Sequence, residues 1–355
     1  MDTLLLSRRD VASLLTIDEC MNAVENAFGL YAEGKAQPPK VLGLPCDHGG
    51  FHIKAGVLGI DKGYFVAKVN ANFPSNPKQY GLPTIQGVIV VCDTINGRLL
   101  ALMDSIEITI IRTGAATGVA ARYLAASNAT IATICGCGNQ GRISLKALLK
   151  VRRLDKLFAF DIDPDQMDKF RKEFGGELEI IPVELKDLPL ALRQSHIAVT
   201  CTTAREPFIH AKDIEPGTFI AAVGADNEDK CELFPELLAS NKVITDITDQ
   251  CVSIGELHHA IESKLMTRCE VHAEIGEVIA RQKRGRVSDE EIIIFDSTGT
   301  ALQDVAAAAI VYEKAIANGM GNKMNFSEQH LTYNPDELNK NERDIKALRR
   351  WFPFR

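Results

Sequence analysis

A glycine-rich turn is the feature of this chain most directly tied to chemistry. In residues 131–142 a β-branched run leads into the pattern G-x-G-x-x-G, formed by Gly136, Gly138 and Gly141. In a dinucleotide site these glycines permit a tight turn, close approach of the backbone to a pyrophosphate, and close packing of helix on strand. The pyrophosphate lies at the N-terminus of the following helix, where free N–H groups favour an anion. The sequence therefore predicts a dinucleotide-binding turn.

An acidic residue at the end of the next predicted strand indicates which dinucleotide binds. Asp161 comes twenty residues after Gly141 and directly follows the strand that begins at Lys156. A carboxylate at this position binds the hydroxyls of the adenosine ribose and repels a 2′-phosphate. Residues 162–164 contain no arginine or lysine that would offset this repulsion. We therefore expect NAD(H) as the cofactor, with NADP(H) disfavoured.

Two cations stand in apolar surroundings in the first third of the chain. Lys68 lies in Phe-Val-Ala-Lys-Val-Asn and Arg112 in Ile-Ile-Arg-Thr-Gly. An unpaired buried charge is very costly, so each cation needs an anionic partner, and a shared substrate carboxylate is one candidate. The alternatives are a lysine whose ammonium reaches water and an arginine with a structural role in its helix.

Polar residues also follow the predicted strands of the second part of the chain, where open parallel sheets bind their ligands. Thr202 and Thr203 end one strand, Asp226 follows the strand at 218–223, and Asp-Ser-Thr-Gly at 296–299 ends the last one. The structural alternatives are a solvent-facing turn for Asp226 and a helix-capping turn for 296–299.

A metal site is not expected. Cys46, His48 and His52 have suitable side chains, but no second ligand cluster accompanies them. The pair His258-His259 is most simply explained as a solvated surface pair.

The elements that must position these residues form two groups. Residues 1 to about 115 indicate an α+β segment, with helices at 17–33 and 107–124 and strands near 51–55, 64–70, 84–93 and 99–104. Asn96-Gly97 predicts a hairpin turn with positive φ at both residues. From residue 129 onward, strands near 131–135, 157–161, 196–201, 218–223, 242–246 and 292–296 alternate with helices near 141–150, 164–174, 184–194 and 231–240. Such alternation is typical of a parallel, doubly wound sheet.

The predicted fold class is therefore α/β, with a Rossmann-type doubly wound parallel sheet and a smaller α+β domain. A chain of 355 residues exceeds the usual limit for one core. We expect the smaller domain at 1–118 with 300–326, since a helix at 301–318 returns to it. The NAD-binding domain is expected at 119–299 and a C-terminal extension at 327–355.

Composition and charge argue against two classes of binding partner, nucleic acids and membranes. The net charge of −7 gives no basic footprint for nucleic acid, and no apolar run is long enough to span a membrane. Nine cysteines, an odd number scattered through predicted helices and strands, favour a reducing cytoplasm over a disulfide framework. We expect a cytoplasmic protein whose partner is a small molecule.

From about residue 5 to residue 326 the chain resembles the ornithine cyclodeaminase/mu-crystallin family. The matching segments come in order along the chain: Pro38-Pro-Lys, Lys68-Val-Asn-x-x-x-Pro74, Gly81-Leu-Pro-Thr84, Arg112-Thr-Gly-Ala-Ala, Gly136-x-Gly138-x-Gln140, Val223-Gly-Ala-Asp226, His-Ala-Glu-Ile-Gly-Glu at 272–277 and Phe295-Asp-Ser-Thr-Gly299.

The resemblance implies a homodimer built through the first domain and a substrate pocket between the domains. It implies that Lys68 and Arg112 hold the α-carboxylate of the substrate, with Lys68 also catalytic, and that Asp226 manages the proton at the α-amino nitrogen. Cofactor contacts are expected from the glycine-rich turn with its neighbours and from the strand ends, namely Gly136, Gly138, Asn139, Gln140, Gly141, Asp161, Thr84, Thr113, Thr202, Thr203, Val223, Ser297 and Thr298.

Two departures from the family pattern bear on the substrate. Lys40 replaces the usual arginine, so the carboxylate clamp loses a bidentate fork. His52 stands about where ornithine cyclodeaminases have a glutamate, and Lys54 replaces a methionine, so two basic groups would repel a diamine side chain. We count Lys40, His52 and Lys54 among the substrate-binding residues.

We therefore expect an NAD(H)-dependent oxidoreductase that transfers hydride at the α-carbon of an amino acid or a cyclic imino acid. One alternative is an ornithine- or lysine-type cyclodeaminase that releases ammonia with catalytic NAD. Another is a non-enzymatic ligand-binding protein similar to mu-crystallin.

Overall fold

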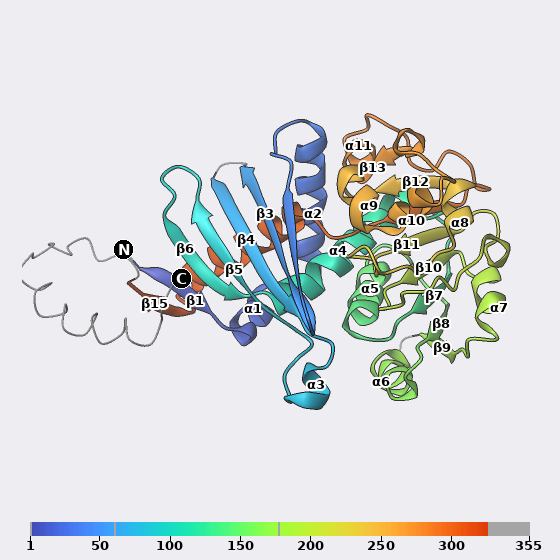
Figure 1. Ribbon diagram of the computed structural model, residues 1–355, viewed down its shortest axis with the longest axis horizontal. Coiled ribbons are helices and arrows are strands. Elements are labelled where there is room, and N and C mark those ends of the chain that lie inside the picture. Colours follow the sequence, from blue (N-terminus) through green and yellow to red (C-terminus); the bar gives the residue numbers. More distant parts are fainter. Residues whose placement is uncertain (1, 60–61, 177, 326–355) are drawn as a thin grey trace, which may run out of the picture.

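The computed structural model describes residues 2–59, 62–176 and 178–325, which form two sheets side by side with helices between and around them (Figure 1). One sheet has seven strands and the other has eight. We call them the first and the second sheet. This arrangement confirms the predicted α/β fold with a Rossmann-type sheet and a second, α+β part.

The second sheet is wholly parallel, in the order β13-β12-β14-β11-β10-β7-β8-β9. The order reverses between β7 and β10, and such a switch point is where doubly wound sheets bind dinucleotides. The strands are β7 (Ile131–Cys135), β8 (Lys156–Phe160), β9 (Glu179–Pro182), β10 (Ile197–Thr200), β11 (Phe219–Ala222), β12 (Lys242–Thr245), β13 (Ala273–Glu274) and β14 (Ile293–Asp296). The helices that connect them are α5 (Asn139–Leu149), α6 (Pro164–Phe174), α7 (Leu188–Arg193), α8 (Pro235–Ala239), α9 (Thr248–Ile254), α10 (Glu256–Glu262) and α11 (Ile275–Ile279).

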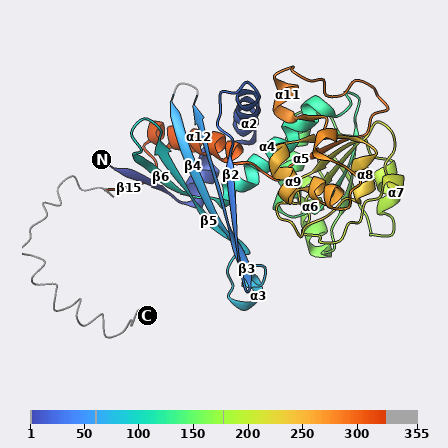
Figure 2. The same cartoon turned by 45° about the horizontal axis from the view of Figure 1, so that its top comes forward.

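The first sheet is mostly antiparallel, in the order β15-β1-β6-β5-β4-β3-β2. Its strands are β1 (Thr3–Leu6), β2 (Lys40–Cys46), β3 (Gly49–Gly59), β4 (Gly63–Asn72), β5 (Ile85–Asp93), β6 (Leu99–Asp104) and β15 (Asn322–Met324). The remaining helices are α1 (Arg8–Leu14), α2 (Ile17–Ala32), α3 (Asn76–Gln79), α4 (Ile106–Leu124) and α12 (Ala301–Asn318). Helix α12 packs across β3 and β4 on one face of this sheet (Figure 2).

Helix α4 joins the two parts because its small residues allow close approach. A Cβ atom on Gly114 would lie 2.7 Å from the Ile143 side chain of α5, and one on Gly118 would lie 2.8 Å from Met21 of α2. The helix packs closely against α5 and α2. Among the described residues, no helix is long and apolar enough to cross a membrane.

Several local predictions were wrong. At the hairpin, Gly97 has φ +71° but Asn96 does not have positive φ. Instead, the side-chain oxygens of Asp93 and Asn96 accept hydrogen bonds from the backbone N–H groups of Ile95 and Arg98. The helix predicted at 231–240 begins only at Pro235, because the N–H groups of Glu232 and Leu233 bond to a buried carboxylate.

The helix predicted at 184–194 shortens to α7, which has a proline in its first turn. Strand β2 was not predicted, although it forms one edge of the first sheet.

The strands of the first sheet lie within residues 3–104 and 322–324, and those of the second within 131–296. The domains at 1–118 with 300–326 and at 119–299 stay a proposal, since their boundary lies within the continuous helix α4. The predicted extension at 327–355 lies outside the described residues.

Candidate active site

The glycine-rich turn has a shape that fits a dinucleotide. Gly136 adopts φ +103°, and a Cβ atom there would lie 3.0 Å from the carbonyl oxygen of Cys201. A Cβ on Gly141 would lie 1.9 Å from the Gly136 oxygen, so only glycine permits α5 to begin this close to β7. A Cβ on Gly138 would meet nothing within 4 Å, which leaves its backbone facing open space at the N-terminus of α5. This is the cradle that a pyrophosphate needs.

Asp161 lies beside this turn, as the spacing predicted. One carboxylate oxygen accepts a hydrogen bond from Cys137 N at 2.7 Å and the other from Asp163 N at 2.9 Å. These bonds orient the carboxylate at the C-terminal end of β8. Nearby, Asn139 is exposed, and the side-chain oxygen of Gln140 is buried without a hydrogen-bond partner among the described residues.

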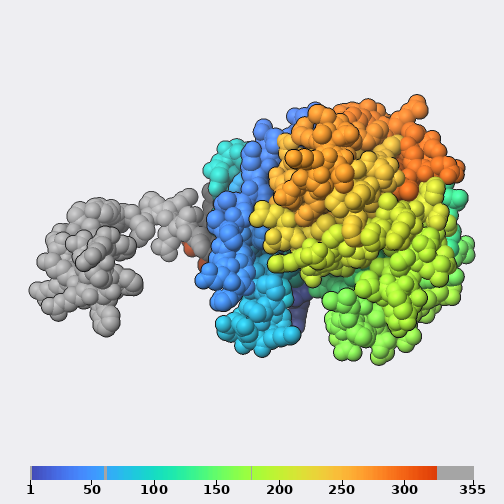
Figure 3. Space-filling view, turned by 45° about the vertical axis from the view of Figure 1, so that its right-hand side comes forward, coloured from blue at the N-terminus to red at the C-terminus, as the bar shows by residue number. Residues whose placement is uncertain are grey.

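The other expected cofactor contacts gather at the same edge of the second sheet. Thr202 and Thr203 follow β10, Val223 follows β11, and Ser297 and Thr298 follow β14. Because the strands are parallel, all these residues lie at the carboxyl ends, where ligands of such sheets bind. The surface is hollowed between the α3 and α6 segments (Figure 3).

Two buried acids that the sequence interpretation missed hold this edge in place. Glu232 accepts hydrogen bonds at 2.7 Å from both the N–H and the hydroxyl of Thr202. Asp246 accepts bonds from the Ser297 hydroxyl at 2.9 Å and from Gly299 N at 2.8 Å. The hydroxyls of Thr202 and Ser297 are therefore already oriented by the protein.

The first sheet presents its cations on the face covered by α12. Alternate residues of β3 share a face, so His52 and Lys54 point the same way, and Lys54 pairs in register with Lys68 of β4. The Lys54 ammonium is buried and donates to the carbonyl oxygens of Thr298 at 2.9 Å and Gly299 at 2.6 Å. Lys54 thus ties the first sheet to the turn after β14.

Lys68 and Arg112 share one buried carboxylate. Asp304, in the first turn of α12, lies 2.8 Å from Lys68 Nζ and 3.2 Å from Arg112 Nε through the same oxygen. Arg112 also donates from Nη1 to the Gln303 side chain at 2.9 Å. No hydrogen bond or ion pair between described residues engages Arg112 Nη2. Asp304 is the anionic partner that the sequence required but did not identify.

Burial and charge set the protonation of this cluster. Burial lowers the pKa of Lys68 to about 7, although the Asp304 carboxylate opposes the shift. Burial also disfavours ionisation of Asp304, but the attraction of Lys68 and Arg112 outweighs it and holds the pKa of Asp304 below its usual value. Lys68 can therefore exchange a proton near neutral pH.

Gly299 packs directly on the guanidinium of Arg112. It adopts φ +74°, and a Cβ atom there would lie 2.1 Å from Arg112 Nη1. The helix-capping role given above as the structural alternative for 296–299 belongs to Thr300, whose side chain accepts a hydrogen bond from Leu302 N. The turn after β14 thus serves as a support for the cations of the first sheet.

Asp226 faces the first sheet at the end of β11. Its carboxylate is about half exposed and pairs with Lys230 Nζ at 2.7 Å. Partial burial opposes ionisation, but Lys230, Lys54 and His52 lower the pKa of Asp226. Burial lowers the pKa of the half-buried His52, against the pull of Asp226. Asp226 is thus ionised at neutral pH and lies near the first-sheet cations.

The remaining predicted residues are less central. Lys40 is exposed and lines a cavity of about 380 Å³ with Tyr31 and Gln250, whose amide bonds to the Thr298 hydroxyl. Thr84 is half-buried just before β5. Thr113 is buried on α4, where its hydroxyl donates to Thr109 O.

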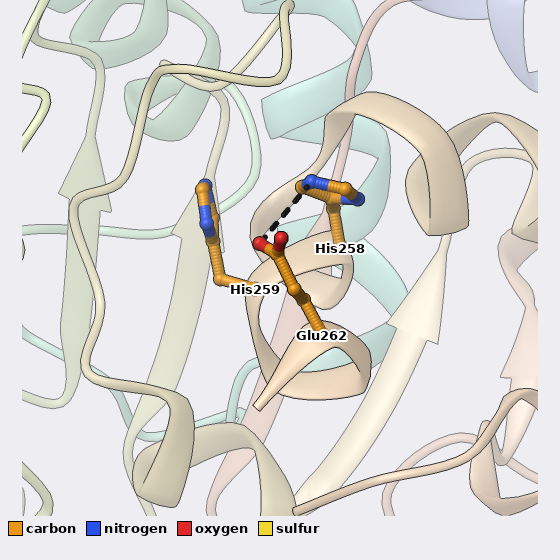
Figure 4. Close-up of side chains that lie close together, drawn as sticks. All are labelled: His258, His259 and Glu262. Carbon is orange, nitrogen blue, oxygen red and sulfur yellow. Dashed lines mark ion pairs between the residues drawn. The ribbon is translucent and has the colours of Figure 1, made fainter. Parts of the chain in front are cut away.

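His258 and His259 are half-buried rather than solvated as predicted (Figure 4). Their rings bond to the backbone oxygens of Val252 and Lys230. They form, with Glu262, the one group of potential metal ligands found among the described residues, which does not include Cys46, His48 or His52. The ring of His259 thus supports the residue that pairs with Asp226.

Known proteins match this chain over nearly its whole length. The sequence profile of the ornithine cyclodeaminase/mu-crystallin family matches residues 1–319. The chain is 40% identical over 329 residues to the alanine dehydrogenase of Archaeoglobus fulgidus, covering 92% of this chain and 99% of that protein.

Two solved structures are similar. An archaeal alanine dehydrogenase dimer with bound NAD has a TM-score of 0.88 at 40% identity, covering 92% of this chain and 100% of that one. The Δ1-pyrroline-2-carboxylate reductase of Thermococcus litoralis, in complex with NADH and L-proline, has a TM-score of 0.84 at 34% identity, covering 91% and 100%. The chain therefore belongs to the ornithine cyclodeaminase/mu-crystallin family.

Proposed function

We propose that the protein is an NAD(H)-dependent oxidoreductase acting at the α-carbon of an amino acid or a cyclic imino acid. One observation carries the proposal. The buried pair of Lys68 and Arg112 adjoins the turn after β14, through Gly299, at the ligand-binding edge of a dinucleotide-binding sheet. A carboxylate-binding site and a cofactor site therefore meet at one place. The similar alanine dehydrogenase and pyrroline-2-carboxylate reductase support this chemistry.

The cations bind and orient the substrate. Arg112 Nη2 is available for the α-carboxylate, and the Lys68 ammonium lies in the same cluster. Charge-assisted hydrogen bonds of this kind are stronger than neutral ones and fix direction as well as affinity. Fixing the α-carbon in a near-attack geometry supplies a large part of a rate enhancement.

Asp226 handles the proton. Oxidation of an α-amino acid removes a hydride from the α-carbon and a proton from the nitrogen, and bound NAD⁺ accepts the hydride. Because Lys230, Lys54 and His52 keep Asp226 ionised, it accepts the proton from the α-amino nitrogen. In the reductive direction, the same carboxylate returns a proton to nitrogen.

NAD(H) is the preferred form of the cofactor. The Asp161 carboxylate is oriented by Cys137 N beside the glycine-rich turn. A 2′-phosphate at that position would meet this negative charge, and no cation among residues 162–164 compensates it. Lys40, His52 and Lys54 complete the proposed substrate site, and the threonines and serine at the strand ends complete the proposed cofactor site.

The protein forms a homodimer through the first sheet. The face opposite α12 carries Leu42, Leu44, Phe51 and Val88, which are between 38% and 52% exposed. Register places Leu42 beside Ile53 and Leu44 beside Phe51, so the apolar side chains form a continuous band. An exposed apolar band of this kind marks an interaction surface. The similar archaeal alanine dehydrogenase was solved as a dimer.

A substrate panel tests the function. L-alanine, L-proline, L-ornithine and L-lysine are offered with NAD⁺, and pyruvate with ammonia or Δ1-pyrroline-2-carboxylate with NADH. The proposal requires a net change in NADH absorbance with at least one substrate in at least one direction. Ammonia release from L-ornithine or L-lysine without net NADH formation would instead identify a cyclodeaminase. Binding without turnover of any panel member would identify a ligand-binding protein.

A further inference from the structure

Among the described residues in contact with Lys68 and Arg112, Asp304 is a buried acid to which the proposed chemistry gives no role. It is fully buried, and one of its oxygens serves both Lys68 and Arg112. Its second oxygen has no hydrogen-bond partner among the described residues. One carboxylate oxygen thus accepts a hydrogen bond from Lys68 and lies in ion-pair contact with Arg112, which brings the two cations to one point.

The charged groups around Lys68 come from three of the elements packed near it. Helix α12 supplies Asp304, α4 supplies Arg112, and β3 supplies Lys54. The Cys20 thiol of α2 also lies near Arg112 and Asp304, but burial raises its pKa to about 12, so it stays neutral. On β5, Lys68 pairs in register with the uncharged Ile89. Within this set of neighbours, Asp304 is the negative charge in direct contact with Lys68.

We propose that Asp304 is a positioning residue that locks Lys68 and Arg112 into one carboxylate-binding clamp and favours the ammonium form of Lys68 over the neutral amine. The proposal rests on the proposed function for its link to substrate binding. Removing the charge would leave Lys68 buried between two other cations, Arg112 and Lys54. Desolvation and like charge then both favour the neutral amine, and the loss of an opposite charge at this distance shifts a pKa by about 1–3 units.

The direct test follows Lys68 itself. In protein labelled with ¹³Cε-lysine, the Lys68 signal is assigned as the one missing from Lys68→Arg. Its titration midpoint is expected near neutral pH in the native protein, at least about one unit lower in Asp304→Asn, and near the native value in Asp304→Glu, which keeps the charge. An unshifted midpoint in folded Asp304→Asn would overturn the inference.

Arg112→Gln keeps the proposal testable even if Asp304→Asn does not fold. With the second cation removed, Asp304 attracts Lys68 alone, and the Lys68 midpoint is expected to rise. A midpoint that stays at the native value in Arg112→Gln also contradicts the clamp.

Kinetics connect the clamp to binding. With the best substrate of the panel, the KM of Asp304→Asn should match the native KM at pH 5.5 and exceed it about tenfold at pH 8, because a midpoint one unit lower leaves a tenfold smaller ammonium fraction. Asp213→Asn is the matched control, since Asp213 is another buried acid, located after β10 and far along the chain from the clamp. It should show no pH-dependent change in KM. A pH-independent loss of activity in Asp304→Asn would mean a merely structural role and overturn the inference.

The two proposals can fail separately. A shifted Lys68 titration in a protein that turns over no panel substrate supports the clamp and overturns only the proposed function. Turnover of a panel substrate together with an unshifted Lys68 midpoint overturns only the clamp and supports the proposed function.

Discussion

Replacing Gly299 with alanine should damage substrate binding more than it damages the fold. Gly299 adopts φ +74°, donates its N–H to Asp246 and accepts from Lys54 through its carbonyl oxygen. A methyl group there would lie 2.1 Å from Arg112 Nη1 and 2.8 Å from Nη2, well inside contact distance. The guanidinium must therefore move by more than one ångström or the turn must open.

The magnitude follows from one cost in stability and two in substrate binding and rate. Left-handed backbone at a residue with a Cβ costs about 1–2 kcal/mol of stability. Displacing Arg112 from a carboxylate removes a charge-assisted hydrogen bond worth about 1.5–3 kcal/mol. A misplacement of about 1 Å can cost about 10²-fold in rate. We expect kcat/KM to fall about 10²-fold, mainly through KM, while the Kd for NADH changes less than about threefold.

Gly97→Ala is the control for backbone strain. Gly97 has nearly the same φ, +71°, but a Cβ there would meet nothing within 4 Å. Gly97→Ala should therefore lose only the stability that left-handed backbone costs and keep its activity, whereas Gly299→Ala should lose more stability, because of the contact with Arg112, and should also lose activity. Steady-state kinetics, NADH titration and melting temperature are measured on the same preparations. If Gly299→Ala kept the kcat/KM of Gly97→Ala, Arg112 would not be the substrate clamp.

Three further predictions test other parts of the site. Native enzyme should prefer NADH over NADPH by at least about tenfold in kcat/KM, and Asp161→Ser should narrow that ratio; equal native use of both would contradict the role of Asp161. Asp226→Asn should retain NADH affinity while kcat falls about 10²–10⁴-fold, the usual contribution of a positioned acid–base group, and a near-native kcat would remove Asp226 from the mechanism. Leu42→Glu should halve the mass measured by light scattering, whereas Ile95→Glu, at a loop position 87% exposed, should not; a native mass for Leu42→Glu would argue against dimerisation through this face.

The cofactor half of the site could be predicted from sequence because its determinants are local. The glycine-rich turn, α5 and Asp161 lie within about thirty residues, and each position has a fixed spacing from the last. Strand and helix periods then placed Thr202 and Ser297 at the ends of parallel strands. Tertiary packing did not need to be known for any of these assignments.

The substrate half could be predicted only in part, since its partners are far apart in sequence. The need of Lys68 and Arg112 for an anion followed from burial alone, but Asp304 is 236 residues from Lys68. Asp304 lies in the first turn of a helix, where acids are common because they interact favourably with the helix dipole. Nothing in the local sequence therefore distinguished it from an ordinary helix-start acid. Glu232 and Asp246 also could not be identified from sequence. Each bonds to a backbone turn distant from it in the chain, and no fixed sequence spacing relates such partners.

The contacts between the two sheets also bear on how substitutions will combine. Lys54 donates hydrogen bonds to carbonyl oxygens of the turn after β14, and Asp246 accepts one from the N–H of Gly299 in that turn. Gly299 also packs on Arg112. The proposed substrate clamp and the proposed cofactor edge therefore share one support, in which each residue contacts the next. Neighbours within one hydrogen-bonded network do not contribute additively to free energy. A double substitution of Asp246 and Lys54 should consequently cost less than the sum of the two single substitutions, because either one alone already releases the turn on which Arg112 rests.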